Sequence, residues 1–318
     1  MENIKVFDVI IIGGGPAGLA AGLYASRAKL EVVSFEKLVY GGQVVLTDKI
    51  ENYPSVTEAS GSRLASNFYN HAVKFGLSIV TSGISKIEER TENGRNIFAL
   101  TDECGKVYNT ISIIVATGAH WRKLGVPGEN KFQGRGVSYC ATCDGPLYKD
   151  KNVVVVGGGN SAVEGALFLT KFVKKLTLIH RRSMLRAAKI LQEELFKNKK
   201  VDVKLDTVIS EIKGTKRVEK IVIKNGKTGG VEELYCEGVF VFIGQDPNTD
   251  LVKDLVKLNE NNFIITDEEM RTSKEGIFAA GDVRRKVLRQ VVTAASDGAI
   301  AAHVVEQYVR KLKGEEYK

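Results

Sequence analysis

The feature that most constrains the fold is a glycine-rich turn between a buried strand and a helix, and the chain contains it twice. In the first copy, residues 7–12 form an apolar run that leads into Gly13-Gly-Gly15-Pro-Ala-Gly18, and residues 19–29 have helix composition. In the second copy, residues 152–156 lead into Gly157-Gly-Gly159-Asn-Ser-Ala162, and a helix is predicted over 161–172. The first glycine permits the turn, the second lets a pyrophosphate reach the backbone, and a small third residue lets helix and strand pack closely. Each copy therefore predicts a nucleotide-binding module.

Both copies continue on one plan. A second strand is predicted over residues 31–36 and 176–179. Strand-like segments follow at 84–89 and 97–101, and at 201–205 and 218–223, and each copy is interpreted as containing an antiparallel insert before its return strand. Return strands over 111–115 and 239–243 lead to Gly118 and Gly244, where a glycine allows close approach to the nucleotide. We expect an α/β protein with two Rossmann-like three-layer nucleotide-binding domains.

The residues after 245 fit neither a third module nor a tail. A strand ends at Gly281-Asp282, and an amphipathic helix is predicted over 290–311. We infer that the second domain is inserted into the first, with domain boundaries at 1–120, 121–246 and 247–318. Asp282 would then bind the ribityl chain of a flavin, and the positive end of the helix near Gln290 would favour the anionic reduced ring.

The two modules differ where their second strands end. The first ends in Glu36, a carboxylate that accepts hydrogen bonds from ribose hydroxyls and repels a 2'-phosphate. The second ends in His180-Arg181-Arg182, with Arg186 one turn later. Guanidinium groups bind a phosphate with charge-assisted hydrogen bonds, so the second module is predicted to prefer NADPH to NADH.

Between the modules lies Cys140-Ala-Thr-Cys143-Asp144, two thiols at a spacing that permits a small-ring disulfide. Zinc binding is the alternative, but zinc needs two further ligands. The other cysteines, Cys104 and Cys236, and the four histidines form no second paired motif. The spacing therefore favours a redox-active pair and no metal.

Composition narrows the possible partners. The 46 Lys and Arg residues against 38 Asp and Glu give a net charge of +8, but no basic cluster is interleaved with aromatic residues. Nucleic-acid binding is therefore not expected, whereas the positive net charge is compatible with an acidic protein partner. The most apolar run, residues 9–24, is short and interrupted by glycines and a proline, and no secretory signal is visible. We expect a cytoplasmic protein that is not anchored in a membrane.

These motifs together resemble the low-molecular-weight thioredoxin reductases along nearly the whole chain. The resemblance includes both glycine turns, the Gly41-Gly-Gln43, Ala116-Thr-Gly-Ala119 and Gly281-Asp-Val283 motifs, and the arginine cluster. The cysteine pair between two nucleotide modules is its specific part, because related flavoproteins that reduce ferredoxin lack it. Small departures are Ser161, where threonine is common, and Gln245-Asp246 at a variable position.

The resemblance implies FAD held by the first and last segments, NADPH held by the middle one, and a homodimer. The implied FAD contacts are Gly13, Gly15, Pro16, Ala17, Gly18, Glu36, Gly41, Gly42, Gln43, Asn52, Thr117, Gly118, Gly281, Asp282, Arg289, Gln290 and Val291. The implied NADPH contacts are Gly157, Gly159, Asn160, Ser161, His180, Arg181, Arg182, Arg186 and Gly244.

The resemblance also implies the roles of the catalytic residues. Cys143 would face the flavin, Cys140 would attack the disulfide of oxidised thioredoxin, and Asp144 would move protons to and from the sulfurs. The structural alternative for Asp144 is a helix cap. If dithiol and nicotinamide must reach the same part of the flavin, the connectors at 118–122 and 244–249 should act as hinges for a domain rotation.

Three other functions fit parts of the pattern. A reductase for another dithiol protein, glutaredoxin-like or of a peroxiredoxin system, would use the same residues. A disulfide-forming oxidase would not need the arginine cluster. A non-catalytic redox sensor would bind nucleotides and signal through the dithiol, yet it would not require two cofactor sites and Asp144.

Overall fold

The computed structural model of the chain describes residues 5–47, 50–92 and 95–314. Residues 1–4, used in the expectation about a secretory signal, and the last four residues of the predicted third segment lie outside this range. The chain divides into two compact units. Unit 1 consists of Met1–His120 together with Asp246–Lys318, and unit 2 of Trp121–Gln245. No described helix is both long and apolar enough to cross a membrane.

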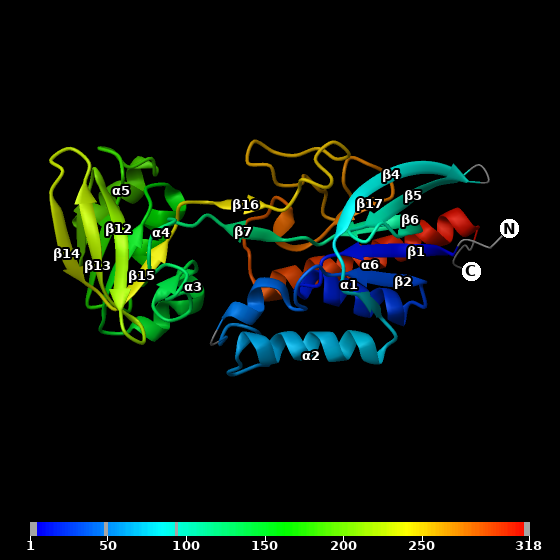
Figure 1. Cartoon of the computed structure of the whole chain (residues 1–318), viewed down its shortest axis with the longest axis horizontal. Coiled ribbons are helices and arrows are strands. Elements are labelled where there is room, and N and C mark those ends of the chain that lie inside the picture. Colours follow the sequence, from blue (N-terminus) through cyan, green and yellow to red (C-terminus); the bar gives the residue numbers. More distant parts are fainter. Residues whose placement is uncertain (1–4, 48–49, 93–94, 315–318) are drawn as a thin grey trace. The chain divides into compact units, whose positions relative to one another are not determined.

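Unit 1 is built on a seven-stranded mixed sheet (Figure 1). Strands β3, β2, β1 and β6 are parallel neighbours, β17 pairs in parallel with the last residues of β6, and β5 and β4 continue the sheet as antiparallel strands. The elements are β1 (Val6–Ile12), α1 (Pro16–Arg27), β2 (Val32–Phe35), the 3-10 helix η1 (Gly42–Leu46), α2 (Gly61–Lys74), β3 (Ser78–Val80), β4 (Ile84–Glu92), β5 (Arg95–Asp102), β6 (Val107–Val115), β17 (Ile277–Ala279), the 3-10 helix η3 (Gly281–Val283) and α6 (Val291–Lys313).

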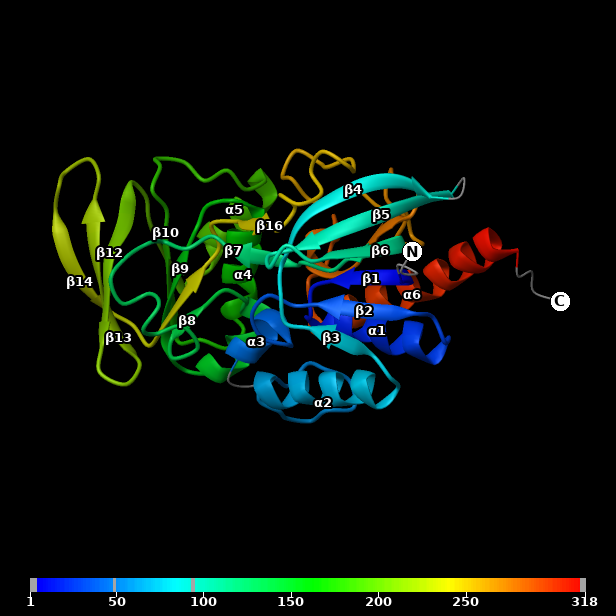
Figure 2. The same ribbon diagram turned by 45° about the vertical axis from the view of Figure 1, so that its right-hand side comes forward.

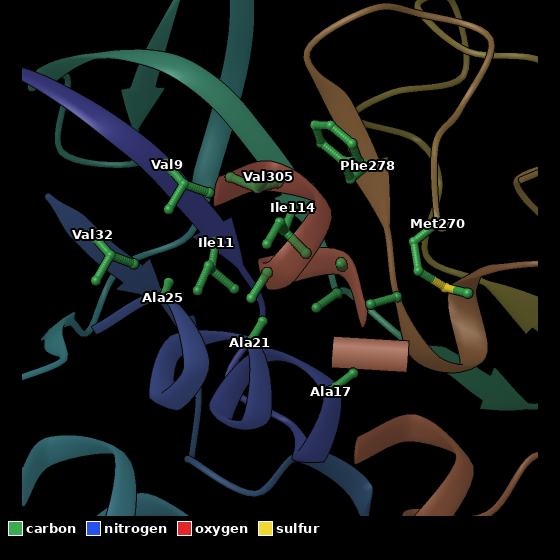
Figure 3. Close-up of a cluster of buried hydrophobic side chains, with 14 of the residues drawn as sticks. Val9, Ile11, Ala17, Ala21, Ala25, Val32, Ile114, Met270, Phe278 and Val305 are labelled. Atoms are coloured by element: carbon green, nitrogen blue, oxygen red, sulfur yellow. The ribbon is translucent and has the colours of Figure 1, made fainter. Parts of the chain in front are cut away.

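The core of unit 1 follows from the alternation of side chains along the central strand. Val9 and Ile11 of β1 point to the same face, where they pack with residues of α1 and with Val305 of α6 (Figure 3). Ile10 points to the opposite face and belongs to a second buried cluster, which includes Val252. A strand that is apolar on both faces is typical of a parallel sheet covered on both sides. This burial holds the C-terminal ends of β1 and β6 side by side. The first glycine turn follows β1 at this edge of the sheet and packs against Ala116, the residue after β6.

Unit 2 has three layers. Its five-stranded parallel sheet runs in the order β11, β10, β9, β15, β8, and an antiparallel sheet of β12, β13 and β14 lies on the side opposite α4 (Figure 2). The elements are β8 (Val137–Ser138), α3 (Ala141–Asp144), the 3-10 helix η2 (Gly145–Tyr148), β9 (Asn152–Val156), α4 (Asn160–Leu169), β10 (Lys175–Ile179), α5 (Lys189–Lys197), β11 (Val201–Lys204), β12 (Thr207–Gly214), β13 (Val218–Asn225), β14 (Val231–Tyr235) and β15 (Gly238–Val241).

The side chains of β9 show why these layers form. Val153 and Val155 pack with residues of α4, whereas Val154 and Val156 pack with residues of β12 and β13. The molecule therefore has the mixed α/β architecture that the repeated pattern predicts.

Two short strands lie where the chain passes between the units. These are β7 (Ala119–Trp121) and β16 (Gln245–Pro247), which pair with each other in a two-stranded sheet. The sequence pattern did not indicate this pairing.

Candidate active site

The first glycine turn is closely packed on one side and open on the other. Gly13 has a φ of +115°, and a Cβ there would lie 2.3 Å from the carbonyl oxygen of Ala116. A Cβ on Gly18 would lie 1.8 Å from the carbonyl oxygen of Gly13, whereas a Cβ on Gly15 would meet nothing within 4 Å. Helix α1 begins at Pro16 with Gly15 as its N-cap, and no side chain caps it. The turn therefore presents uncapped backbone N–H groups next to open space, which suits an anion.

Glu36 braces this turn from the end of β2. One carboxylate oxygen accepts a hydrogen bond from the Gly14 N–H at 2.7 Å, and the other accepts one from the Leu38 N–H at 2.8 Å. The carboxylate is thus held in place, and each oxygen keeps a lone pair for another donor. The sequence suggested only the ribose contact and missed the bracing role.

The Gly41-Gly42-Gln43 segment closes over the same turn. The Gly41 N–H donates to the carbonyl oxygen of Gly14 at 2.7 Å, and Gly42 begins η1. The Gln43 side-chain amide donates to the carbonyl oxygen of Ala119. The first hydrogen bond holds the segment against the glycine turn, and the second ties it to β7.

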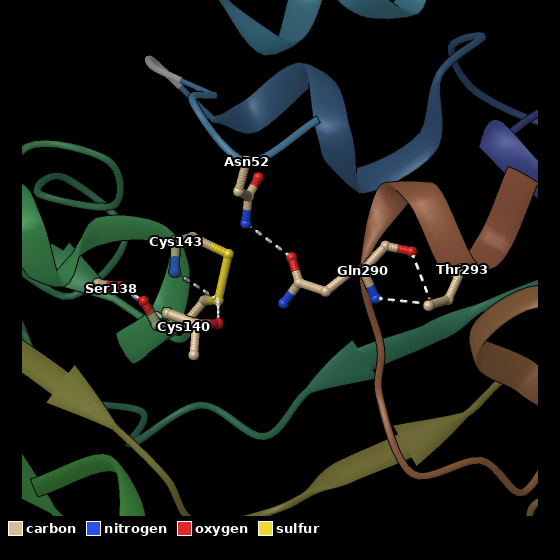
Figure 4. Close-up of a disulfide and its surroundings, with 7 residues drawn as sticks. Asn52, Ser138, Cys140, Cys143, Gln290 and Thr293 are labelled. Atoms are coloured by element: carbon tan, nitrogen blue, oxygen red, sulfur yellow. Dashed lines mark hydrogen bonds between the residues drawn. A yellow bond between two sulfur atoms is a disulfide. The ribbon is translucent and has the colours of Figure 1, made fainter. Parts of the chain in front are cut away.

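Asn52 and Gln290 meet although they are far apart in the sequence. The Asn52 side-chain amide donates to Gln290 Oε1 at 3.0 Å (Figure 4). Gln290 is the N-cap of α6 and forms a capping box with Thr293. Val291 is the first residue of the helix, so the start of α6 is fixed from both sides.

Asp282 is held in a buried turn with an acceptor atom still available. Gly281 has a φ of +80° and is the first residue of η3. Asp282 Oδ1 is buried and has no hydrogen-bond partner among the described residues. Burial raises the pKa of the Asp282 carboxyl group, an effect that the positive charges of Lys286 and Arg289 oppose. Such a buried acceptor usually has a ligand or water as its partner.

Thr117 and Gly118 are tied to the returning chain by Asn248. The Asn248 side-chain amide donates to the Thr117 carbonyl oxygen, and the Thr117 hydroxyl donates to the Asn248 carbonyl oxygen, each at 2.7 Å. The Asn248 N–H donates to the carbonyl oxygen of Gly118 at 3.0 Å, and Asn248 Oδ1 lies 2.9 Å from His120 Nδ1. Asn248 was not among the residues that the sequence singled out.

The second glycine turn repeats the geometry of the first. Gly157 has a φ of +149°, and a Cβ on Gly159 would meet nothing within 4 Å. Helix α4 begins with Asn160 and Ser161, and no side chain caps it. Asn160 Oδ1 accepts a hydrogen bond from the Ala188 N–H at 2.9 Å, which ties the helix start to the segment after β10. Gly244, at the end of this module, has a φ of +115°.

The basic segment after β10 lies against the second turn. The His180 ring packs over Gly158, where a Cβ would be 2.4 Å from the ring, and its Nε2 has no partner among the described residues. Burial lowers the pKa of His180, and the nearby charge of Arg186 lowers it further. Arg181, Arg182 and Arg186 are exposed, and none of them forms an ion pair within the described part of the chain. Three guanidinium groups are therefore available to an anionic ligand.

Cys140 and Cys143 form a disulfide at the start of α3, with Cα atoms 5.3 Å apart (Figure 4). The Cys140 N–H donates to Ser138 Oγ at 3.1 Å, and the Cys143 N–H points at Cys140 Sγ at 3.2 Å. The Asp144 N–H donates to the carbonyl oxygen of Cys140 at 3.2 Å. Both cysteines are half-buried, so the sulfur atoms are held firmly without being sealed from a partner.

A buried carboxylate that the sequence did not reveal supports the residue before the disulfide. Glu129 is 2% exposed and accepts hydrogen bonds from the N–H groups of Leu124 and Gly125 and from the Tyr139 hydroxyl, each at 2.8 Å. The Tyr139 ring stacks on Trp121. Glu129 lies in a polar stretch of sequence with no motif, so nothing in the pattern distinguished it from a surface residue.

The remaining thiols have different surroundings. Cys236 is buried, and burial raises the pKa of its thiol to about 12. Cys104 is exposed. Tyr148 lies behind the disulfide helix, and burial together with the charge of Asp144 raises its pKa to about 12. Because a thiolate is the reactive form of cysteine, Cys236 is a packing residue.

Comparison with known proteins agrees with this geometry. The family model for pyridine nucleotide-disulphide oxidoreductases matches residues 7–298. The chain belongs to this family of enzymes. It is 46% identical to the thioredoxin reductase of Treponema pallidum (strain Nichols), with 96% of this chain and 98% of that protein covered. It is 48% identical to the thioredoxin reductase of Peptoclostridium litorale, with 99% of this chain and 100% of that protein covered.

A solved structure shows the same relationship. The thioredoxin reductase from Streptococcus pyogenes MGAS5005 superposes with a TM-score of 0.91 at 46% identity, covering 96% of this chain and 99% of that one. Within its family, the chain therefore groups with the thioredoxin reductases.

Proposed function

We propose that this chain is an NADPH-dependent thioredoxin reductase that holds FAD as its resident cofactor. The observation that carries the proposal is the Cys140–Cys143 disulfide in a chain that also has two open glycine turns. The partner is inferred from the relatives, since the similarity to proteins named thioredoxin reductase extends over at least 96% of the chain.

The residues of unit 1 fit FAD. The space at Gly15 and the uncapped start of α1 suit a pyrophosphate, and the Glu36 carboxylate held beside the turn suits the hydroxyl groups of a ribose. The buried, unpartnered Oδ1 of Asp282 suits a hydroxyl of the ribityl chain. These fits support FAD as the cofactor of unit 1.

The residues of unit 2 fit NADPH. A Cβ on Gly159 would have open space around it at the uncapped start of α4, as at the first turn. Three exposed guanidinium groups without ion-pair partners in the described residues lie on the segment that packs against this turn. A 2'-phosphate is the group that would use them.

The residues of α3 perform the exchange with the partner protein. When bound, FAD supplies the redox centre that takes an electron pair from NADPH and delivers it to the disulfide. Reduction breaks the bond between Cys140 and Cys143 and leaves two thiols. The Cys143 N–H, which points at Cys140 Sγ, favours the thiolate of Cys140.

Thiol exchange then proceeds in two displacements. The Cys140 thiolate attacks one sulfur of oxidised thioredoxin and displaces the other, which forms a mixed disulfide. The Cys143 thiolate attacks Cys140 Sγ, re-forms the ring and releases reduced thioredoxin. Asp144 holds the proton that Cys143 loses and that the leaving sulfur needs.

Three further assignments belong to this proposal. Residues 1–120 and 247–318 form the FAD-binding domain, and residues 121–246 form the NADPH-binding domain with the dithiol. The protein works as a homodimer. Its compartment is the cytoplasm, where NADPH and thioredoxin are expected.

An anaerobic titration with NADPH tests the redox chain. The flavin-loaded protein should take up about two equivalents per chain before the flavin absorbance is fully bleached, because flavin and disulfide each accept an electron pair. The Cys140→Ser/Cys143→Ser variant should take up about one equivalent. Equal uptake by the two proteins would show that the cysteines do not receive electrons from the flavin.

Turnover assays identify the partner. With thioredoxin as substrate, NADPH oxidation should be continuous and should depend on both cysteines. Turnover with a glutaredoxin-like protein but not with thioredoxin would show that thioredoxin is not the partner. Bleaching without turnover of any dithiol protein would favour a redox sensor.

A further inference from the structure

Asp297 of α6 is a buried carboxylate with three donors. Its Oδ2 accepts hydrogen bonds from the Gly281 N–H at 3.0 Å and from Lys286 Nζ at 2.7 Å, and its Oδ1 accepts one from Arg284 at 3.1 Å. The side chains of Asp297 and Lys286 are 9% and 8% exposed. One carboxylate therefore engages two cations that come from the segment just after Asp282.

Asp282 itself lacks such a partner. Its Oδ1 is buried and unpartnered in the described part of the chain, although the charges of Lys286 and Arg289 reach it. Arg289 is engaged elsewhere, because its guanidinium stacks on Phe263 at 4.1 Å and donates to the carbonyl oxygens of residues 282, 284 and 286. All of the cations around Asp282 are thus occupied by other acceptors.

We propose that Asp297 is a positioning residue that keeps Lys286 and Arg284 away from Asp282, so that the Asp282 carboxylate stays available to a hydroxyl of FAD. This inference rests on the proposed function, since it assigns a role in binding that cofactor. A free Lys286 would form a charge-assisted hydrogen bond to Asp282, and a neutral hydroxyl cannot compete with such a bond. The chain supplies a second carboxylate on α6 that removes this competitor.

The Asp297→Asn variant tests whether Lys286 or Arg284 competes with FAD for Asp282. Asparagine offers one acceptor oxygen in place of two, so one of the cations loses its partner. The affinity of the flavin-free, full-length variant for FAD should fall about tenfold or more. Quenching of flavin fluorescence on binding measures this affinity. The visible circular dichroism of the bound flavin reports its environment independently of turnover.

A second substitution separates this role from a merely structural one. Adding Lys286→Met to Asp297→Asn removes the competing cation, so the double variant should bind FAD more tightly than Asp297→Asn alone. If the buried cluster only stabilises the fold, the second loss should weaken binding further. Lys286→Met alone leaves Asp297 paired with Arg284 and Gly281, and it should bind FAD at least as tightly as the unmodified chain.

Asp8 provides a matched control. It is also a buried carboxylate, and it accepts hydrogen bonds from Lys313 at 2.7 Å and from the Glu31 N–H at 3.0 Å, but it is not part of the segment around Asp282. Asp8→Asn should lower the unfolding midpoint with FAD affinity within about twofold of the unmodified chain.

The outcomes are distinct. Unchanged FAD affinity in Asp297→Asn, or weaker binding when Lys286→Met is added, would overturn the inference while the proposed function stands. If Asp297→Asn does not fold, weaker binding by Lys286→Met alone would overturn it as well. Failure of the unmodified chain to bind FAD would overturn both the inference and the proposed function.

Discussion

At the scale of single residues, three exposed arginines beside an open glycine turn are the clearest sign of an anionic ligand. Arg181, Arg182 and Arg186 have no ion-pair partner in the described residues, and they lie on the segment that packs against the second turn. The sequence predicted this cluster because its position after a second strand is fixed by the repeat. It did not predict Glu129 or Asp297, since each acts through neighbours that only the folded chain brings to it.

Replacing the arginines should change the choice of nucleotide. We expect Arg181→Gln and Arg182→Gln each to raise the KM for NADPH roughly tenfold, because each removes a charge-assisted hydrogen bond to the 2'-phosphate. The KM for NADH should hardly change. Steady-state kinetics with both nucleotides measures the ratio, and Arg271→Gln, at an exposed arginine paired with Glu269, is the control. An equal loss with NADH would contradict this assignment.

His180 predicts a pH dependence of stability. Its folded-state pKa is lowered from 6.5, chiefly by burial, so the unfolded chain binds more protons just below pH 6.5. The contribution of His180 is therefore complete above the unfolded pKa and is lost as pH falls from 6.5 toward the lowered value. We expect His180→Gln to reduce the slope of unfolding free energy against pH in this window, by at most about 1.4 kcal/mol per pH unit.

Urea unfolding at a series of pH values measures that slope. His71→Gln, at an exposed histidine, is the matched control. Identical slopes for His180→Gln and the unmodified chain would mean that His180 does not titrate differently on folding.

At the scale of elements, the strands were predictable and several helices were not. The apolar runs that became β1, β9 and β10 are buried on both faces, and burial produces an unmistakable pattern. Helix α2 was not predicted from the sequence, and it buries only four residues, Gly61, Leu64, Ala65 and Ala72. The return strand of unit 1, predicted over 111–115, begins earlier, at Val107 of β6, whose first half pairs with β5 and whose last residues pair with β17.

The packing of α1 on α6 depends on a glycine that no motif marks. A Cβ on Gly298 would lie 2.1 Å from the Ala17 carbonyl oxygen. Gly298→Ala should therefore separate the helices and lower the unfolding free energy by about 1–3 kcal/mol. Because Gly298 follows Asp297, FAD affinity should fall too. Denaturant unfolding is the measurement, with Ser296→Ala, at an exposed position of the same helix, as the control. Equal unfolding free energies for these two variants would show that α6 can move without cost.

At the scale of the whole molecule, the proposed sites are divided between the two units. The residues proposed for FAD belong to unit 1, whereas the disulfide and the residues proposed for NADPH belong to unit 2. If the dithiol and the nicotinamide use the same part of the flavin, they must do so in turn. The polypeptide passes between the units at β7 and β16, and Asn248 fixes the part of these connectors nearest unit 1. A rotation would then be absorbed close to residues 121–122 and 244–245.

If such a rotation occurs, we expect it, and not hydride transfer, to limit the rate at which NADPH reduces the flavin. That rate should then depend on the viscosity of the solvent. In stopped-flow experiments at saturating NADPH, the limiting rate should fall roughly twofold when sucrose doubles the viscosity, because unit motions on the microsecond to millisecond scale are damped by solvent. Ficoll should have less effect, because this polymer raises the bulk viscosity but adds less friction to motions of the protein than a small solute does. Deuterated NADPH should then slow the rate only slightly, since breaking the C–H bond is not the slow step. If the rate does not change with sucrose and shows a full isotope effect, hydride transfer is the rate-limiting step. No unit rotation would then be needed to explain turnover.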